Sequence, residues 1–228
     1  MSLALRKSDF TQRGRFITFE GGEGSGKTTQ SKKLFAKLDE VGIGVMWTRE
    51  PGGSYGAEEI RSLLVKGESD RWAPSTEALL MFAARDDHWK TWIEPALEAG
   101  TWVICDRFAD SSYAYQGYGK GVSIDFLKAL YQNTVGATQP DRTYLFDVPV
   151  DIGLARAHTR MSAVQVKEDR FEGLGSPFHE RVRAGFKALA NEDSSRIFTL
   201  DATQSIETLE AQVWQDVQCL MSLATAHG

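Results

Sequence analysis

Short apolar runs alternate along the chain with longer stretches whose apolar residues recur at helical spacing. The short runs predict strands at Phe16–Glu20, Ile43–Thr48, Trp102–Asp106, Thr143–Asp147 and Ile197–Leu200. The longer stretches predict helices at Lys27–Val41, Ser75–Ala99, Ile124–Thr134 and Ile206–Leu223. Strands that alternate with helices form βαβ units with right-handed crossovers. We therefore expect an α/β fold of three layers, with a five-stranded parallel sheet flanked by helices.

One segment departs from this alternation. Residues 151–190 are mostly helical in pattern, but residues 161–177 within them are polar and contain glycine. We expect a helical lid at about residues 156–177. No internal repeat or low-complexity linker divides the chain, so residues 15–228 are predicted to form one domain behind an N-terminal extension, residues 1–14.

The composition of the chain argues against several classes of binding partner. The chain has 228 residues, 42% of them hydrophobic, and no run near the roughly 18 apolar residues of a membrane span. A net charge of −5 argues against broad nucleic-acid binding, although it permits a local basic cleft. Two distant cysteines, Cys105 and Cys219, make no disulfide framework, which favours a cytoplasmic location. We expect neither a membrane nor a stable nucleic-acid partner.

The segment GGEGSGKT, residues 21–28, fits the Walker A pattern G-x-x-x-x-G-K-[ST] and lies between a predicted strand and a predicted helix. Glycines let backbone N–H groups turn toward phosphate oxygens, and the helix N-terminus favours the same anion. The expected ATP-binding residues are Gly21, Gly22, Glu23, Gly24, Ser25, Gly26, Lys27, Thr28 and Thr29. An incidental glycine-rich turn is the alternative, and the strand–loop–helix context disfavours it. The fold is therefore expected to be of the P-loop NTPase type.

Two oxygen side chains are expected near a metal ion. The Thr28 hydroxyl is the Walker A ligand of Mg²⁺, and Asp106 ends the strand Trp102–Asp106, where a carboxylate often holds Mg²⁺ through water. The alternative for Asp106 is a capping role beside a surface arginine. Next to a Walker A loop, we favour the Mg²⁺ site.

Four further blocks decide between the classes of P-loop protein. They are TREPGG (residues 48–53), EALLMFAAR (77–85), DRFADSSYAYQG (106–117), and DRFE (169–172) with FHERVR (178–183). In this order and spacing, the chain resembles thymidylate kinase from about Arg15 to its last helix. The resemblance implies transfer of the γ-phosphoryl group of ATP to the 5′-phosphate of dTMP, giving dTDP for dTTP synthesis. It also implies Mg²⁺ as cofactor and a homodimer.

The resemblance implies an acceptor that is already an anionic oxygen, so no general base is needed. Catalysis then depends on positioning two anions and neutralising their charge. The residues expected to do so are Lys27, Arg107 and the lid arginines Arg156 and Arg160. Arg156 and Arg160 are four residues apart, on one helical face, and Arg170 is another option.

The dTMP site is also assigned by the resemblance. Arg107 is expected to bind the acceptor phosphate, with Arg49 and Arg61 as further candidates. Pro51 constrains the turn after the second strand, and the sequence leaves open whether its peptide is cis. Surface ion pairing is the alternative for Arg61.

The base pocket follows from the same likeness. Phe82 is expected to stack on thymine, and Arg85, almost one helical turn later, to bond the base edge. Core packing is the alternative for Phe82. Ser112 and Gln116 are expected to face the base, and Tyr115 the sugar, although the block could be merely a Ser/Tyr-rich loop.

Glu23 is unusual because a carboxylate in a phosphate cradle repels ATP. The resemblance implies that it points toward dTMP and binds the 3′-hydroxyl. Some relatives carry an arginine at the next position, where this chain has Gly24, so the missing charge is expected to come from the lid.

Other functions stay open at this stage. A kinase for another (deoxy)nucleotide or a deoxynucleoside is one alternative, and a non-catalytic nucleotide-binding module is another. A nucleoside kinase needs a carboxylate base, and a dead kinase commonly loses Lys27, Thr28, Asp106 or Arg107, all present here. We expect Cys105 to be an inert core residue, and Trp89 and Trp92 to serve packing rather than to contact the substrate.

Overall fold

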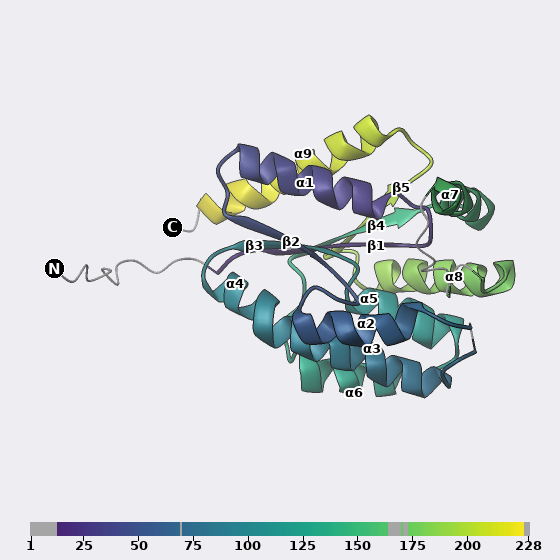
Figure 1. Cartoon of the computed structure of the whole chain (residues 1–228). Helices are drawn as coiled ribbons and strands as arrows, with labels where there is room; N and C mark the ends of the chain where they lie inside the picture. Colours follow the sequence, from purple (N-terminus) through teal and green to yellow (C-terminus); the bar gives the residue numbers. More distant parts are fainter. Residues whose placement is uncertain (1–12, 69, 164–169, 171–172, 226–228) are drawn as a thin grey trace.

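A sheet of five parallel strands forms the middle layer of the protein, as the alternating pattern predicts (Figure 1). This computed structural model describes residues 13–68, 70–163, 170 and 173–225, without the side chains of residues 160–163 and 223–225. The strands are β1 (Phe16–Gly21), β2 (Val45–Arg49), β3 (Trp102–Asp106), β4 (Arg142–Asp147) and β5 (Ile197–Asp201), in the order β2-β3-β1-β4-β5. Each begins and ends within two residues of its predicted counterpart.

Helices cover both faces because successive strand residues point to opposite sides. Ile17 and Phe19 of β1 pack under α1 (Lys27–Glu40) and α9 (Ile206–Thr225). Phe16 faces the other layer, with α3 (Pro74–His88) and α6 (Ile124–Thr134). Figure 1 shows α1 and α9 on one side of the sheet and α3 and α6 on the other.

The remaining helices extend these layers. They are α2 (Tyr55–Val65), the π-helical η1 (Trp89–Ile93), α4 (Glu94–Glu98), α5 (Ala109–Ser112), the π-helical η2 (Tyr113–Gly119), α7 (Val150–Ala163) and α8 (Ser176–Glu192). The long predicted helix 75–99 is thus α3, η1 and α4 in continuous sequence. Trp89 is buried, whereas 49% of the Trp92 surface is exposed, so only Trp89 packs fully within the fold.

The Ser/Tyr-rich block after β3 is helical and not a loop. Residues 109–119 form α5 and η2, although serine, tyrosine and glycine give no helical periodicity. The start of α5 is fixed from outside, because Glu20 accepts hydrogen bonds from the backbone N–H groups of Phe108 and Ser111. These are donors that a helix leaves unpaired at its N-terminus.

Of the predicted lid, residues 156–163 lie in α7, and residues 164–169, 171 and 172 lie outside the described part of the chain. Most of the extension, residues 1–12, is also outside it. Across the helices that are described, none has the length and apolar character needed to cross a bilayer.

Candidate active site

The Walker A segment forms a cradle between β1 and α1. Gly21, Gly24 and Gly26 all have positive φ, at 142°, 63° and 88°, which favours glycine over other residues. Lys27 Nζ donates to the carbonyl of Gly22 at 3.0 Å. Burial, joined by the charge of Arg107, lowers the pKa of Lys27 to about 8. The cradle therefore holds its lysine where an added anion would keep it charged.

Two oxygen ligands meet at the mouth of this cradle. Thr28 Oγ1 donates to Asp106 Oδ2 at 2.5 Å, and Asp106 Oδ1 is buried without a hydrogen-bond partner among the described residues. A hydroxyl and a carboxylate suit Mg²⁺, which takes one or two protein oxygens together with substrate phosphates and water. Within the described ranges, no group of three or more His, Cys, Asp or Glu could hold a metal. The residues present therefore fit a magnesium ion bound jointly with a nucleotide.

The carboxylate of Glu23 is neutralised by neighbouring donors and cations. Glu23 Oε1 accepts from Arg107 Nη2 at 2.9 Å and from the Tyr115 hydroxyl at 2.8 Å. Burial would raise the pKa of Glu23, but the charges of Arg107 and Lys27 lower it to about 2. Glu23 thus points toward two residues predicted to bind dTMP, which removes much of its repulsion toward a triphosphate.

Arg107 is held in a strained backbone conformation. Its φ is 70°, in the left-handed region that residues other than glycine rarely occupy. Its guanidinium donates to the Gly21 carbonyl at 3.1 Å and to Ser111 Oγ at 3.1 Å, besides Glu23. The guanidinium also lies over the Tyr115 ring, 5.0 Å from the centroid. The strain places this charge between the cradle and η2.

Arg85 is a buried cation with one vacant donor group. Its Nε donates to Glu50 Oε2 at 2.7 Å and its Nη2 to Ser112 Oγ at 3.1 Å. Its Nη1 is buried and meets no hydrogen-bond acceptor in the described part of the chain. Buried polar groups are nearly always paired, so an orphaned arginine nitrogen indicates a place for a ligand acceptor. The guanidinium lies 4.5 Å from the centroid of the Phe82 ring.

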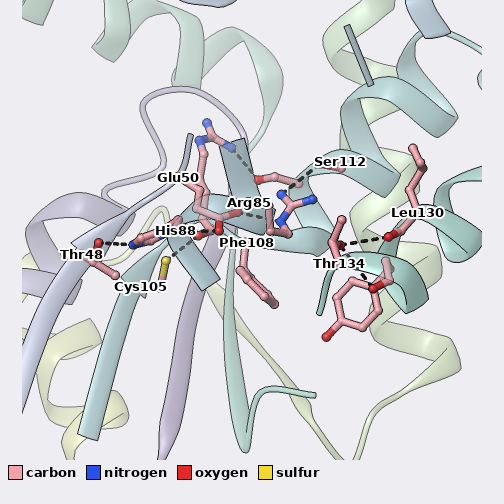
Figure 2. A network of polar contacts seen from close by, with 12 residues as sticks. Thr48, Glu50, Arg85, His88, Cys105, Phe108, Ser112, Leu130 and Thr134 are labelled. Carbon is pink, nitrogen blue, oxygen red and sulfur yellow. Dashed lines mark hydrogen bonds and ion pairs between the residues drawn. The ribbon is translucent and has the colours of Figure 1, made fainter. Parts of the chain in front are cut away.

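A chain of buried side chains orients Arg85 (Figure 2). Glu50 bridges Arg85 and His88, with Oε1 3.2 Å from His88 Nδ1. His88 Nε2 lies 2.7 Å from Thr48 Oγ1 on β2. Gly53 allows this approach, since a Cβ there would be 2.3 Å from His88 Nε2. The network joins the turn after β2 to the C-terminal end of α3.

The other predicted base-pocket residues lie close to Arg85 in the fold. Phe82 is buried beneath the Arg85 guanidinium, so its expected stacking on thymine stays a prediction. Ser112 accepts from Arg85, and Gln116 Nε2 donates to Glu77 Oε1 at 2.9 Å.

The arginines predicted to reach the acceptor phosphate flank the turn after β2. Arg49 Nη2 lies 3.4 Å from Glu58 Oε1, and Arg61 Nη1 donates to the Pro51 carbonyl at 2.7 Å. The Glu50–Pro51 peptide is cis. In the sheet, Arg49 is the register partner of Asp106, so this turn adjoins the metal-ligand candidates.

Gly24 cannot carry a side chain in this fold. A Cβ there would lie 2.0 Å from the Gly153 carbonyl oxygen and 3.1 Å from Arg156 Cβ. Helix α7 therefore packs directly on the cradle and brings Arg156 beside Gly24. Arg156 Nη1 donates to the Ala202 carbonyl at 2.8 Å. The side chain of Arg160 lies outside the described part of the structure.

Arg170, the further candidate from the lid, is placed elsewhere. Its Nη1 pairs with Glu77 Oε2 at 2.6 Å and donates to the Leu64 carbonyl at 3.0 Å. Its Nε donates to the Glu68 carbonyl at 2.9 Å, and the residue is buried. These contacts give Arg170 a structural place between α2 and α3.

The sequence did not single out the acids that position these groups. Glu20, Glu50 and Glu77 are buried carboxylates within or beside apolar segments, which is the one signal that could have marked them. Burial together with the Asp110 charge raises the pKa of Glu20 to about 7. Cys105 is buried on β3 as expected, and its pKa is raised well above the usual value, which makes it inert.

Comparison with known proteins gives a consistent picture. The family model described as thymidylate kinase matches residues 19–213. A thymidylate kinase of Caulobacter vibrioides is 47% identical over 200 residues, covering 88% of this chain and 94% of the relative. One of Nitrobacter winogradskyi is 46% identical over 214 residues, covering 94% of this chain and 92% of the relative. The crystal structure of thymidylate kinase from Ehrlichia chaffeensis superposes with a TM-score of 0.73 at 34% identity, covering 90% and 99% of the two chains.

Proposed function

This chain belongs to the thymidylate kinase family, and from that premise we propose that it transfers the γ-phosphoryl group of ATP to the 5′-phosphate of dTMP. The products are dTDP and ADP, and the reaction serves dTTP synthesis. The observation that carries the choice of acceptor is the vacant Nη1 of buried Arg85. That donor group fits a base carbonyl such as O4 of thymine.

The transfer needs no proton acceptor on the protein. An anionic oxygen of the dTMP phosphate attacks the γ-phosphorus, and the bond to the bridging oxygen of ADP breaks. The protein holds the two anions in line and offsets their charge. Lys27 binds the β- and γ-phosphates from the P-loop, residues 21–28, where an anion restores the charge that burial disfavours.

Thr28 and Asp106 are proposed to hold Mg²⁺, Asp106 through water. When bound with ATP, the ion would offset the charge that develops on the phosphates. The proposal is supported by the unpartnered Asp106 Oδ1.

Arg107 is proposed to bind the acceptor phosphate. Its guanidinium is shared with Glu23, which keeps it between the P-loop and η2. A planar fork of N–H groups suits a phosphate better than a lysine does. Arg49 and Arg61 approach the same phosphate from the turn after β2. Glu23 and Tyr115 then face the sugar, where the Tyr115 ring disfavours a 2′-hydroxyl.

The lid is proposed to donate the charge that Gly24 lacks. Arg156 is the described candidate, because its Cβ already lies beside Gly24. To reach the transferring phosphoryl group, its guanidinium must leave the Ala202 carbonyl. Arg160 lies one turn further along α7 and is the alternative.

We further propose that the enzyme works in the cytoplasm as a homodimer. The half-exposed side chains of Leu79 on α3 and Trp92 on η1 support a contact on that side. Size-exclusion chromatography with light scattering tests this, with twice the chain mass of 25.3 kDa expected.

A coupled ADP-release assay tests the reaction and its acceptor. With ATP and Mg²⁺, we expect turnover on dTMP, weaker turnover on dUMP, and none on dCMP, dGMP or thymidine. Lys27→Ala is the control. Preference for thymidine would indicate a nucleoside kinase, and retained ATP binding without turnover would indicate a regulatory module.

A further inference from the structure

Glu77 is a fully buried carboxylate on α3 whose two oxygens have different partners. Oε2 accepts from two cations, Lys120 Nζ at 2.8 Å and Arg170 Nη1 at 2.6 Å. Oε1 accepts from Gln116 Nε2 at 2.9 Å. Buried charges require partners of this kind. The division between the two oxygens, however, also controls the neighbouring amide.

The Gln116 side-chain amide can have only one orientation beside the Glu77 carboxylate. A glutamine amide has a donor end, Nε2, and an acceptor end, Oε1. An ion-paired carboxylate accepts hydrogen bonds and donates none, so Nε2 must face Glu77. Oε1 is then turned away from Glu77, and among the described residues it receives no hydrogen bond.

Gln116 belongs to the same helical stretch as Ser112, which accepts a hydrogen bond from Arg85. Gln116 is four residues beyond Ser112, and both stand on the continuous stretch α5–η2. Two contacts therefore connect that stretch to α3: Arg85 with Ser112, and Glu77 with Gln116. Between them the two helices offer a vacant donor, Arg85 Nη1, and a vacant acceptor, Gln116 Oε1.

This pairing of donor and acceptor matches one class of pyrimidine. Thymine presents a carbonyl acceptor, O4, beside a donor, N3–H. Cytosine presents the reverse, an amino donor at C4 beside an acceptor at N3. A reversed amide at Gln116 would favour cytosine at the N3 position.

We propose that Glu77 is a specificity-determining positioning residue, which fixes the Gln116 amide so that its carbonyl faces N3–H of the acceptor base. The proposal rests on the proposed function, since it assumes a thymine nucleotide in this pocket. Glu77 itself does not touch the base. It acts through Gln116, while Lys120 and Arg170 hold the carboxylate in place.

Glu77→Gln tests this by reversing the amide. Both cations require an oxygen at the former Oε2 position, so the new side chain must turn its amino group toward Gln116. Gln116 must then offer its carbonyl to that amino group and its own Nε2 to the base. We expect the dissociation constant of dTMP to rise and that of 5-methyl-dCMP to fall or stay constant. Their ratio should change about tenfold, the effect of one mismatched hydrogen bond.

Three variants separate positioning from general damage. Lys120→Met removes a cation from the same carboxylate but leaves Oε1 to hold Gln116, so the ratio should stay within twofold of wild type. Gln116→Leu should lower the discrimination between dTMP and 5-methyl-dCMP although Glu77 is unchanged. The double variant Glu77→Gln/Gln116→Leu should then match Gln116→Leu, because Glu77 acts only through the amide.

Isothermal titration calorimetry with the two nucleotides measures these constants, and thermal melting reports the stability of each variant. If Glu77→Gln weakens the binding of dTMP and 5-methyl-dCMP equally, or leaves the ratio of their dissociation constants unchanged, the proposal is overturned. A further change of the ratio in the double variant would overturn it as well. If wild type phosphorylates dTMP but the ratio does not move, only this inference fails. If wild type does not use dTMP, the proposed function fails first.

Discussion

Glu23 and Arg107 show how single residues reconcile conflicting charges in this site. The carboxylate lies in the P-loop but accepts from Arg107 and Tyr115, so we expect it to face away from the phosphates of a bound ATP. The acid also fixes the arginine, whose backbone is strained. Each residue therefore positions the other, and neither role is visible from residue type alone.

The strain at Arg107 has a measurable consequence for stability. Arg107→Gly and Arg107→Ala both remove the guanidinium, but only glycine accepts a φ of 70° without cost. We expect the glycine variant to be the more stable by about 1 kcal/mol, or about 2–4 °C in Tm. Thermal melting of both variants measures the difference.

The same pair of substitutions at Arg183 is the control. Arg183 lies inside α8, where glycine is expected to be less stable than alanine by about 1 kcal/mol. An alanine variant at position 107 that equals or exceeds the glycine variant in Tm would contradict the claim of strain.

The pKa of Lys27 predicts how ATP binding depends on pH. Burial lowers that pKa to about 8 in the free protein, and a bound anion favours the charged form. ATP affinity should therefore be full below pH 8 and fall as the pH rises above it. Calorimetry with ATP between pH 7 and 9.5 measures this. Lys27→Ala should bind weakly at every pH, and a flat wild-type profile would count against the assignment.

At the scale of elements, we expect α7 to supply a charge that the P-loop cannot carry at Gly24. Gly24 has a φ of 63° and the Gly153 carbonyl directly against it. An arginine side chain at this position has no room in this chain. Arg156 on α7 stands beside the same point, its Cβ 3.1 Å from where a Cβ of residue 24 would lie.

Arg156→Ala should therefore lower kcat strongly, by about 10³-fold, since a transition-state arginine contributes 10³–10⁵ in related transfers. The KM of dTMP should change little. Adding Gly24→Arg should not restore the rate lost in Arg156→Ala, because a side chain at position 24 collides with the Gly153 carbonyl. Steady-state kinetics of the single and double variants measure this, and rescue by Gly24→Arg would refute the account.

The elements were largely predictable from sequence, and their cross-connections were not. Apolar periodicity located each strand within two residues, since buried parallel strands are apolar throughout. Helices α5 and η2 were missed because Glu20, far away in the chain, fixes their start. The contacts of Glu50 with Arg85 and of Glu77 with Gln116 join segments 35 and 39 residues apart. Side-chain pairing at that separation follows from packing, which no local pattern records.

At the scale of the whole molecule, the site gathers at the carboxyl edge of the sheet. The P-loop follows β1, Glu50 and its turn follow β2, and Asp106 ends β3. Strands β2, β3 and β1 are neighbours, so three segments far apart in sequence meet there. Ligands in open α/β sheets bind at this edge. We therefore expect ATP and dTMP to be held by different elements that meet at this edge.

This separation predicts that the two ligands stabilise the protein independently. Each, at 100 times its Kd, should add about 2.7 kcal/mol, or roughly 5–10 °C in Tm. Arg85→Met should lose most of the shift caused by dTMP and keep the shift caused by ATP. Thermal melting with each ligand alone measures both in one variant, so general destabilisation cancels. Equal loss of both shifts would contradict separate sites.

The most direct test of the central claim is phosphorus NMR of the protein with ATP, Mg²⁺ and dTMP. We predict that the dTMP signal declines while the two phosphorus resonances of dTDP appear in step with ADP, and that Lys27→Ala shows neither change. Release of inorganic phosphate without dTDP, or no change in any resonance, would contradict the assignment of this site as a dTMP kinase.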